Sequence, residues 1–240
     1  MKRAATRAAL LLMLGLALGA RAAPPLLFVT EEQPPASYLA DDGKTVIGTS
    51  TALLREMLRR LDLDADFALY AWRMAFRLAQ SSPETCVYST ARTEAREKLF
   101  KWVGPISENT WVVYALADSP ISARQIEDLR PYNIGGYYID AKTLYLRERG
   151  LSLNLAETEA QGLKKLAAGR VDLWLSTARS APWLAEQLDI KIKPVLVLRR
   201  ARLYAACNPT VPDALIQRMN VTLREMRQDG SWARIAPLPD

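Results

Sequence analysis

The chain has 240 residues, of which 32 are Lys or Arg, 26 are Asp or Glu, none is His, and half are apolar. The lack of histidine excludes Ser-His-Asp and Cys-His catalysis and every histidine metal site. The two cysteines, Cys86 and Cys207, are far apart in the sequence and do not form a zinc-binding pattern. Carboxylate, tyrosine or arginine chemistry remains open, as does binding without catalysis.

The first residues have the three-part layout of a secretory signal peptide. Three basic residues precede an apolar run over 8–20, which ends in Ala20-Arg21-Ala22. The run is too short to span a bilayer, and no later segment approaches that length. We expect a signal peptide at 1–22, cleaved near Ala22. Its removal takes away four basic and no acidic residues and lowers the net charge from +6 to +2, so no electrostatic case for nucleic-acid binding remains.

The first half of the mature chain alternates short apolar runs with amphipathic segments. The pattern predicts strands at 26–30, 66–70 and 86–90, and helices at about 50–61, with Thr49 or Ser50 as N-cap, and at 72–80. Strands and helices that alternate with short links predict a parallel, doubly wound sheet. Ligands bind such sheets at the carboxyl ends of the strands, which here are 30–31, 70–72 and 89–92.

The segment 89–102 stands out at one of these strand ends. The hydroxyl groups of Ser89 and Thr90 lead into a basic helical turn with Thr93 as the expected N-cap. Hydroxyls, free backbone N–H groups and two arginines, Arg92 and Arg96, are the combination that an anionic small molecule needs. A solvated helix start with surface arginines is the alternative interpretation.

The strand–helix rhythm restarts after residue 120 and predicts a second α/β unit. A further strand at 111–116 precedes this unit. After it, strands are expected at 133–138, 171–176, 191–198 and 202–207, and helices at 140–149 with Asp140 as N-cap, around 163–167, at 180–188 and from 212 to 229. The last strand and helix are most simply interpreted as returning to the first unit.

The order of several motifs resembles one family. Thr93-x-x-Arg96 is followed by Phe100 and by Gly104-Pro105-Ile106, and further matches are Thr30-Glu31-x-x-Pro34-Pro35, Gly48 with Leu53-Leu54, Asp128-Leu129, Ile134-Gly135, Ala168-Gly169-Arg170-Val171-Asp172 and Arg227-x-x-Gly230-x-Trp232-x-x-Ile235. Together these motifs, over nearly all of the mature chain, resemble the bacterial extracellular solute-binding proteins of family 3, the periplasmic receptors of polar amino-acid ABC transporters.

The resemblance implies a two-lobed α/β fold of the type II periplasmic-binding kind. Each lobe would hold a mainly parallel sheet flanked by helices, with a ligand cleft between the lobes. Lobe one would comprise 24–117 plus 201–240, and lobe two 118–200. The returning strand with Cys207 would lie beside the strand with Cys86, which favours a disulfide over two buried, unpaired thiols.

The same resemblance assigns the ligand-binding residues. Arg96 would pair with a ligand carboxylate, Ser89 would bond the ligand, and Glu31 would face its ammonium group. Trp72 would line the cleft, or serve only as a core anchor. The remaining candidates are Thr90, Arg92, Asp140, Tyr138 and Ser176.

Lobe two departs from the family pattern. The sequence Leu175-Ser176-Thr177 stands where the family has an aspartate for the α-ammonium group, and Asp140-Ala141 stands near the position of a carboxylate-binding threonine. Asp140 would either supply the missing negative charge or be a plain N-cap.

The leading hypothesis is a monomeric periplasmic binding protein without cofactor, metal or catalytic activity. It would capture a small polar solute that carries a carboxylate and deliver it to an inner-membrane ABC permease. One alternative is a dehydratase-like enzyme on the same fold, with Glu31 or Asp140 as its carboxylate. The other is a soluble ligand sensor that serves a membrane kinase.

Overall fold

A computed structural model describes residues 25–138 and 140–236, so the predicted signal peptide at 1–22 lies outside the described residues. Within these ranges, none of the helices has the length and apolarity needed to cross a bilayer.

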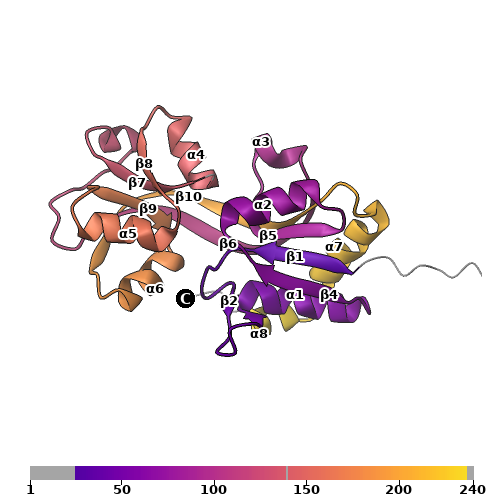
Figure 1. Cartoon of the computed structure of the whole chain (residues 1–240). Helices are drawn as coiled ribbons and strands as arrows, with labels where there is room; N and C mark the ends of the chain where they lie inside the picture. The colour runs from indigo at the N-terminus through magenta and orange to yellow at the C-terminus, as the bar shows by residue number, and fades with distance from the viewer. Residues whose placement is uncertain (1–24, 139, 237–240) are drawn as a thin grey trace, which may run out of the picture.

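One eight-stranded sheet runs through the whole molecule in the order β4-β1-β5-β10-β6-β9-β7-β8 (Figure 1). Its strands are β1 (Leu26–Thr30), β4 (Ala65–Leu69), β5 (Thr85–Ala91), β6 (Lys101–Leu116), β7 (Ile134–Tyr137), β8 (Leu153–Ala156), β9 (Leu173–Thr177) and β10 (Ile192–Cys207). Pairing is parallel at both ends of the sheet, within β4-β1-β5 and within β9-β7-β8. A separate two-stranded hairpin joins β2 (Tyr38–Leu39) and β3 (Val46–Ile47).

Helices cover both faces of the sheet in each of two lobes. They are α1 (Thr49–Arg60), α2 (Trp72–Ser81), α3 (Glu94–Glu97), α4 (Ala141–Arg147), α5 (Glu159–Ala167), α6 (Ser180–Gln187), α7 (Asp213–Gln228) and α8 (Ser231–Ile235), with a short 3₁₀ helix, η1, at Ile126–Leu129. In lobe one, α1 and α7 pack on one face of the sheet and α2 on the other. In lobe two, α5 and α6 pack on one face and α4 on the other. Figure 1 shows the two groups side by side with β6 and β10 running between them.

The two long strands β6 and β10 join the lobes. They pair antiparallel from Leu116 opposite Ile192 to Lys101 opposite Cys207. At Glu108 and Asn109, β6 pairs with β10, and in the described part of the sheet neither strand has a second ladder partner there. This part of the sheet is therefore a two-stranded ribbon between two wider parts of the same sheet.

The sequence analysis was wrong about the extent of these strands. It predicted only the second half of β6 and divided β10 into two strands. The middle of both strands carries polar and charged residues, because the ribbon there packs against less protein than the strand ends do. Among these residues are Glu108, Asn109, Arg199, Arg200 and Arg202. Their polarity removes the apolar pattern that identifies a buried strand.

One predicted helix start also needs correction. Thr49 and Ser50 lie inside α1, whose N-cap is Gly48. Gly48 has a φ of 118°, and a Cβ at this position would overlap the backbone of Ala36, so glycine is required. Thr93 does hold the N-cap position of α3, but its side chain makes no capping hydrogen bond and the helix is a single turn. Asp140 caps α4 as predicted, because its side chain accepts a bond from the Lys142 N–H.

A disulfide bond links Cys86 and Cys207, as the resemblance favoured. The two residues face each other on the neighbouring strands β5 and β10, and both are fully buried in the core of lobe one. The bond therefore connects an early strand of the chain with a late one, across a sequence separation of 121 residues.

Candidate functional site

Two adjoining cavities lie between the lobes. The inner cavity has a volume of about 40 Å³ and is lined from lobe one by Glu31, Gln33, Trp72, Ser89, Ala91, Arg96 and Leu203, from the ribbon and its lobe-two end by Asn109, Trp111 and Thr177, and from lobe two by Asp140, Ala141 and Lys142. The outer cavity has a volume of about 570 Å³. Glu31 and Gln33 line both cavities, so the two meet at the loop that follows β1.

Arg96 provides a buried guanidinium group in the inner cavity. It lies on α3, is 4 % exposed, and donates a hydrogen bond to the Ala91 carbonyl over 3.3 Å. Its guanidinium carbon stands 5.8 Å from the Trp72 ring centre and 4.9 Å from that of Phe76, within the range of cation–π attraction. Burial lowers the pKa of Arg96, while the charge of Asp140 opposes that shift.

Two polar atoms in the inner cavity have no hydrogen-bond partner in the described structure. They are Ser89 Oγ and Asn109 Oδ1, both fully enclosed. Ser89 also has a φ of 56°, a left-handed conformation that costs free energy for a residue other than glycine. Buried polar atoms without partners and a strained backbone are typical of positions that contact a ligand.

Lys142 forms the centre of an ionic cluster in lobe two. It is 2 % exposed, and its Nζ donates to Asp140 Oδ2 and, over 2.6 Å, to Glu159 Oε1. Glu159 Oε2 accepts a second bond, from Ser176 Oγ over 3.2 Å. Burial disfavours the charged form of Lys142, but the two carboxylates outweigh burial and raise its pKa.

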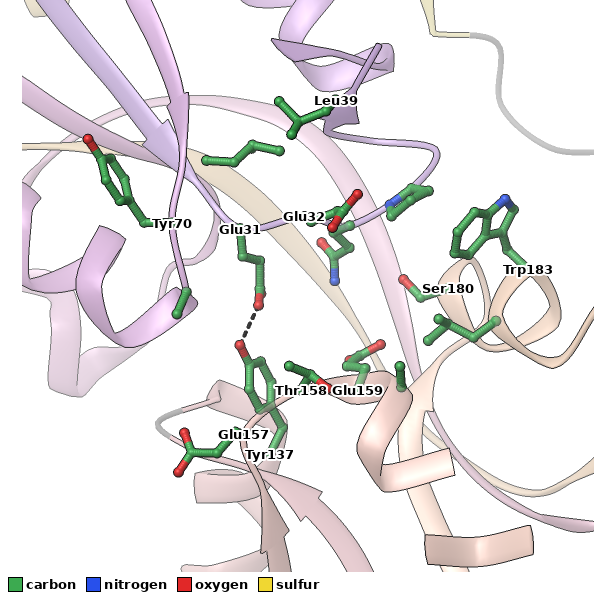
Figure 2. A pocket seen from close by; sticks show the side chains of 16 residues that line it. Glu31, Glu32, Leu39, Tyr70, Tyr137, Glu157, Thr158, Glu159, Ser180 and Trp183 are labelled. Atoms are coloured by element: carbon green, nitrogen blue, oxygen red, sulfur yellow. Dashed lines mark hydrogen bonds between the residues drawn. The ribbon is translucent and has the colours of Figure 1, made fainter. Parts of the chain in front are cut away.

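Glu31 and Tyr137 join the two lobes directly. The Tyr137 hydroxyl, at the end of β7, donates to Glu31 Oε2 over 2.5 Å, and Figure 2 shows the two side chains pointing toward one another across the cleft. Burial raises the pKa of Glu31 to about 8. Glu159 and Asp140 also raise it, whereas the bond from Tyr137 and the charge of Lys142 lower it. Burial and the neighbouring Glu31 raise the pKa of Tyr137, so its hydroxyl stays protonated as a donor.

The outer cavity is acidic and aromatic. Glu31, Glu32, Glu157 and Glu159 line it together with the rings of Tyr70, Tyr137 and Trp183, and among the described residues of its lining none is Lys or Arg. Figure 2 shows Tyr70 and Trp183 on opposite sides of this space.

Five of the nine candidate residues come together in the inner cavity: Glu31, Trp72, Ser89, Arg96 and Asp140. Trp72 is 6 % exposed and packs in the core of lobe one as well as lining the cavity, so both interpretations of this residue describe part of its environment.

The other four candidates lie outside both cavities. Thr90 is buried and donates to the Val87 carbonyl. Arg92 is exposed, pairs with Glu97 and stands over the rings of Trp102 and Tyr204. Tyr138 faces the Arg73 guanidinium at 5.8 Å, and Ser176 reaches the cleft only through Glu159.

The sequence analysis did not single out Tyr137, Lys142, Glu159 or Asn109. Tyr137 was within reach, because it ends a parallel strand and the rule that ligands bind beyond such ends applies to lobe two as well. Lys142 and Glu159 carry no comparable signal, since a helical Lys and Glu are ordinarily solvent-exposed. Asn109 was placed outside any predicted strand.

A two-lobed α/β protein with a polar cavity between its lobes has the architecture of a small-molecule binding protein. The family model of bacterial extracellular solute-binding proteins, family 3, matches residues 26–237, and the chain belongs to this family. The family and the two-lobed periplasmic-binding fold that the sequence motifs predicted are thereby confirmed. The lobe boundaries at 117/118 and 200/201 stay predictions.

Similar solved structures agree on the fold. A histidine kinase sensor domain similar to periplasmic binding proteins has a TM-score of 0.82 and 22% identity, and the match covers 88% of this chain and 94% of that domain. An ancestral arginine-binding protein bound to arginine has a TM-score of 0.77 and 20% identity, with 88% and 96% covered. An arginine transport system periplasmic binding protein from Legionella pneumophila has a TM-score of 0.73 and 23% identity, with 88% and 97% covered. No curated protein matches the sequence.

Proposed function

We propose that this protein captures a small polar solute through a carboxylate group in the inner cavity, and that it works in the periplasm and delivers the solute to an inner-membrane ABC permease. The observation that carries the proposal is the convergence of the Arg96 guanidinium and the unpartnered Ser89 hydroxyl on one small cavity between the lobes. A guanidinium and a hydroxyl donate hydrogen bonds, and a buried carboxylate needs such donors to leave water. The unpartnered Asn109 Oδ1 is an acceptor and would take a hydrogen bond from an N–H or O–H group of the solute.

The size of the inner cavity fits this assignment. Its volume of about 40 Å³ holds about three water molecules, at roughly 10–15 Å³ for each. A carboxylate group occupies a comparable space, and the rest of the solute would extend into the outer cavity. Lobe closure around the solute would then be the step that a permease recognises.

The test is a screen of the purified protein by thermal shift and calorimetry against amino acids, dicarboxylates, polyamines and sugars. We expect carboxylates to raise the melting temperature, because a ligand of the folded state stabilises it by linkage. Arg96→Ala should weaken their binding on the order of a hundredfold, the usual cost of leaving a buried charge without its partner.

Arg92→Ala is the matched control. This arginine lies four residues earlier and is exposed on the same segment, paired with Glu97, so its removal should leave binding unchanged. A carboxylate that binds equally well to the Arg96→Ala protein, whose fold is checked by circular dichroism, contradicts the proposal.

A second function has one observation in its favour, the TM-score of 0.82 to a histidine kinase sensor domain. On this alternative, the protein binds the same solute but reports it to a membrane kinase. Deleting the protein would then change kinase signalling and leave uptake of the labelled solute intact. The enzyme alternative is tested in the calorimetry samples, where recovery of the unchanged solute by mass spectrometry speaks for a binding protein.

A further inference from the structure

The ionic cluster around Lys142 restricts which solute the cleft accepts. Each oxygen of its two carboxylates already has a donor from this chain. Asp140 Oδ1 accepts the Lys142 backbone N–H over 2.9 Å and Oδ2 accepts Nζ, while Glu159 accepts Nζ and the Ser176 hydroxyl. Lys142 also lines the inner cavity together with Arg96. An ammonium group of the protein itself therefore lies beside the place where the solute carboxylate would bind.

A solute with an α-ammonium group would bring a second ammonium into the same place. Its positive charge would compete with Lys142 Nζ for Asp140 and Glu159, and like charges in a buried site repel each other strongly. Glu31, the other carboxyl group that lines the inner cavity beside Asp140, already accepts a hydrogen bond from Tyr137. Displacement of Nζ would leave a buried ammonium without partners, which is strongly unfavourable.

The charges around the inner cavity balance once the partner of Lys142 in the outer cavity is included. Arg96 and Lys142 are positive, and Asp140 in the inner lining and Glu159 in the outer lining, both paired with Lys142, are negative. Burial together with neighbouring carboxylates keeps Glu31 largely neutral at pH 7. A simple monocarboxylate would add a negative charge with no counterpart, which a buried site tolerates poorly. The solute therefore has to carry a positive charge of its own, away from its carboxylate.

The outer cavity offers the place for that charge. It adjoins the inner cavity at Glu31 and Gln33 and is large enough, at about 570 Å³, for the body of a small solute. Glu32 and Glu157 supply negative charge, and the rings of Tyr70 and Trp183 can attract a cation through their faces.

We propose that Lys142 is a resident ammonium group that fills the place of an α-ammonium, so that the solute is an acid with its cationic group at the far end, an ω-amino or ω-guanidino acid. The proposal rests on the proposed function, since it assumes that a carboxylate binds in the inner cavity. Beyond that function, the proposal says that the carboxylate and the cationic group of the solute lie at opposite ends of the molecule. It names Lys142 as the residue that determines this preference.

The first test compares matched pairs of acids on the unaltered protein by calorimetry. Lysine is compared with ε-aminocaproate, and arginine with δ-guanidinovalerate, which differ only in the α-amino group. We expect the acid without the α-amino group to bind about tenfold tighter or more, equivalent to about 1.4 kcal/mol. If lysine and arginine bind as tightly as their partners, or more tightly, the proposal about Lys142 is wrong and the proposed function stands. The same holds if dicarboxylates bind and neither member of either pair does. Failure of every carboxylate to bind overturns the proposed function as well.

The second test changes Lys142. In Lys142→Ala the α-amino acid can supply the missing ammonium, so the preference within each pair should disappear or reverse. Lys164→Ala, on the exposed side of α5, is the matched control and should keep the preference.

A third measurement examines Lys142 without any solute. Removal of its ammonium group leaves Asp140 and Glu159 without their cation, so the melting temperature of Lys142→Ala should fall. Methylammonium chloride should restore part of the loss, whereas tetramethylammonium chloride, which has no N–H donor, should not. Equal responses to the two salts, or an unaltered preference within the pairs in Lys142→Ala, contradict the assignment of Lys142.

Discussion

The protonation of Glu31 is linked to the distance between the two lobes, because Glu31 of lobe one is bonded to Tyr137 of lobe two. Its pKa of about 8 in this arrangement exceeds its ordinary value of 4.5, because burial favours the neutral carboxyl. When the close approach of the lobes raises the pKa of an acid, the protonated acid stabilises the closed lobes. This stabilisation is complete at pH values below the ordinary pKa. The contribution falls as the pH rises from about 4.5 and is lost above about pH 8.

We therefore expect the lobes to separate more readily at pH 9 than at pH 5. Small-angle X-ray scattering should give a larger radius of gyration at the higher pH for the unaltered protein. Glu31→Gln keeps the acceptor for Tyr137 but cannot ionise, so its radius should change much less over the same range. An identical pH response of the two proteins would show that Glu31 is not the titrating group.

Several side chains of lobe one that line the inner cavity could be predicted from the sequence. Arg96 and Ser89 follow one strand, and Glu31 follows another, so the ends of parallel strands bring them together. The roles of Lys142 and Glu159 could not be predicted, because both depend on the packing of α4, α5 and β9, which are separate in the sequence. Burial of a charged side chain is a property of the packed molecule and leaves no local pattern.

Among the packed elements, α5 and β9 approach each other unusually closely at Gly162. A Cβ at this position would stand 2.7 Å from Trp174 Nε1 and 3.0 Å from Cδ1. Helix propensity alone favours alanine over glycine by about 1 kcal/mol. We nevertheless expect Gly162→Ala to lower the free energy of unfolding by about 1–3 kcal/mol, because the indole is fully buried and has no room to move. Urea unfolding measures the change.

Lys164→Ala, two residues further along α5 on its exposed side, serves as the control and should have little effect. A stabilised Gly162→Ala protein would mean that α5 can move away from β9 at little cost.

Local periodicity predicted most elements but not their full extent. The apolar face of α1 and the short runs of β1 and β5 are regular and were located within one or two residues. The four-residue strand β8, the two-residue strands of the hairpin and the middle of β10 were missed. These segments are held by hydrogen bonds to other strands, within the hairpin for β2 and β3 and across the large sheet for β8 and β10, rather than by an apolar pattern of their own.

For the whole molecule, the Cys86–Cys207 bond closes a loop with a sequence separation of 121 residues. A cross-link of this size removes much of the freedom of the unfolded chain, and the chain-entropy relation gives about 5 kcal/mol of stabilisation. We expect the double variant Cys86→Ala, Cys207→Ala to unfold at a clearly lower urea concentration. A reducing agent should lower the midpoint of the unaltered protein and leave that of the double variant in place. Equal midpoints for the two oxidised proteins would contradict this account.

The position of β10 between β5 and β6 also determines the order in which the chain can fold as it is made from its N-terminus. Once β9 has emerged from the ribosome, it can pair with β6. Strands β7, β8 and β9 can then form their part of the sheet. β5 and the first half of β6 still lack the strand that separates them, and Cys86 lacks its partner. Lobe one, whose first strands are made earliest, is thus completed last. The disulfide can form only after Cys207, at the end of β10, has been made.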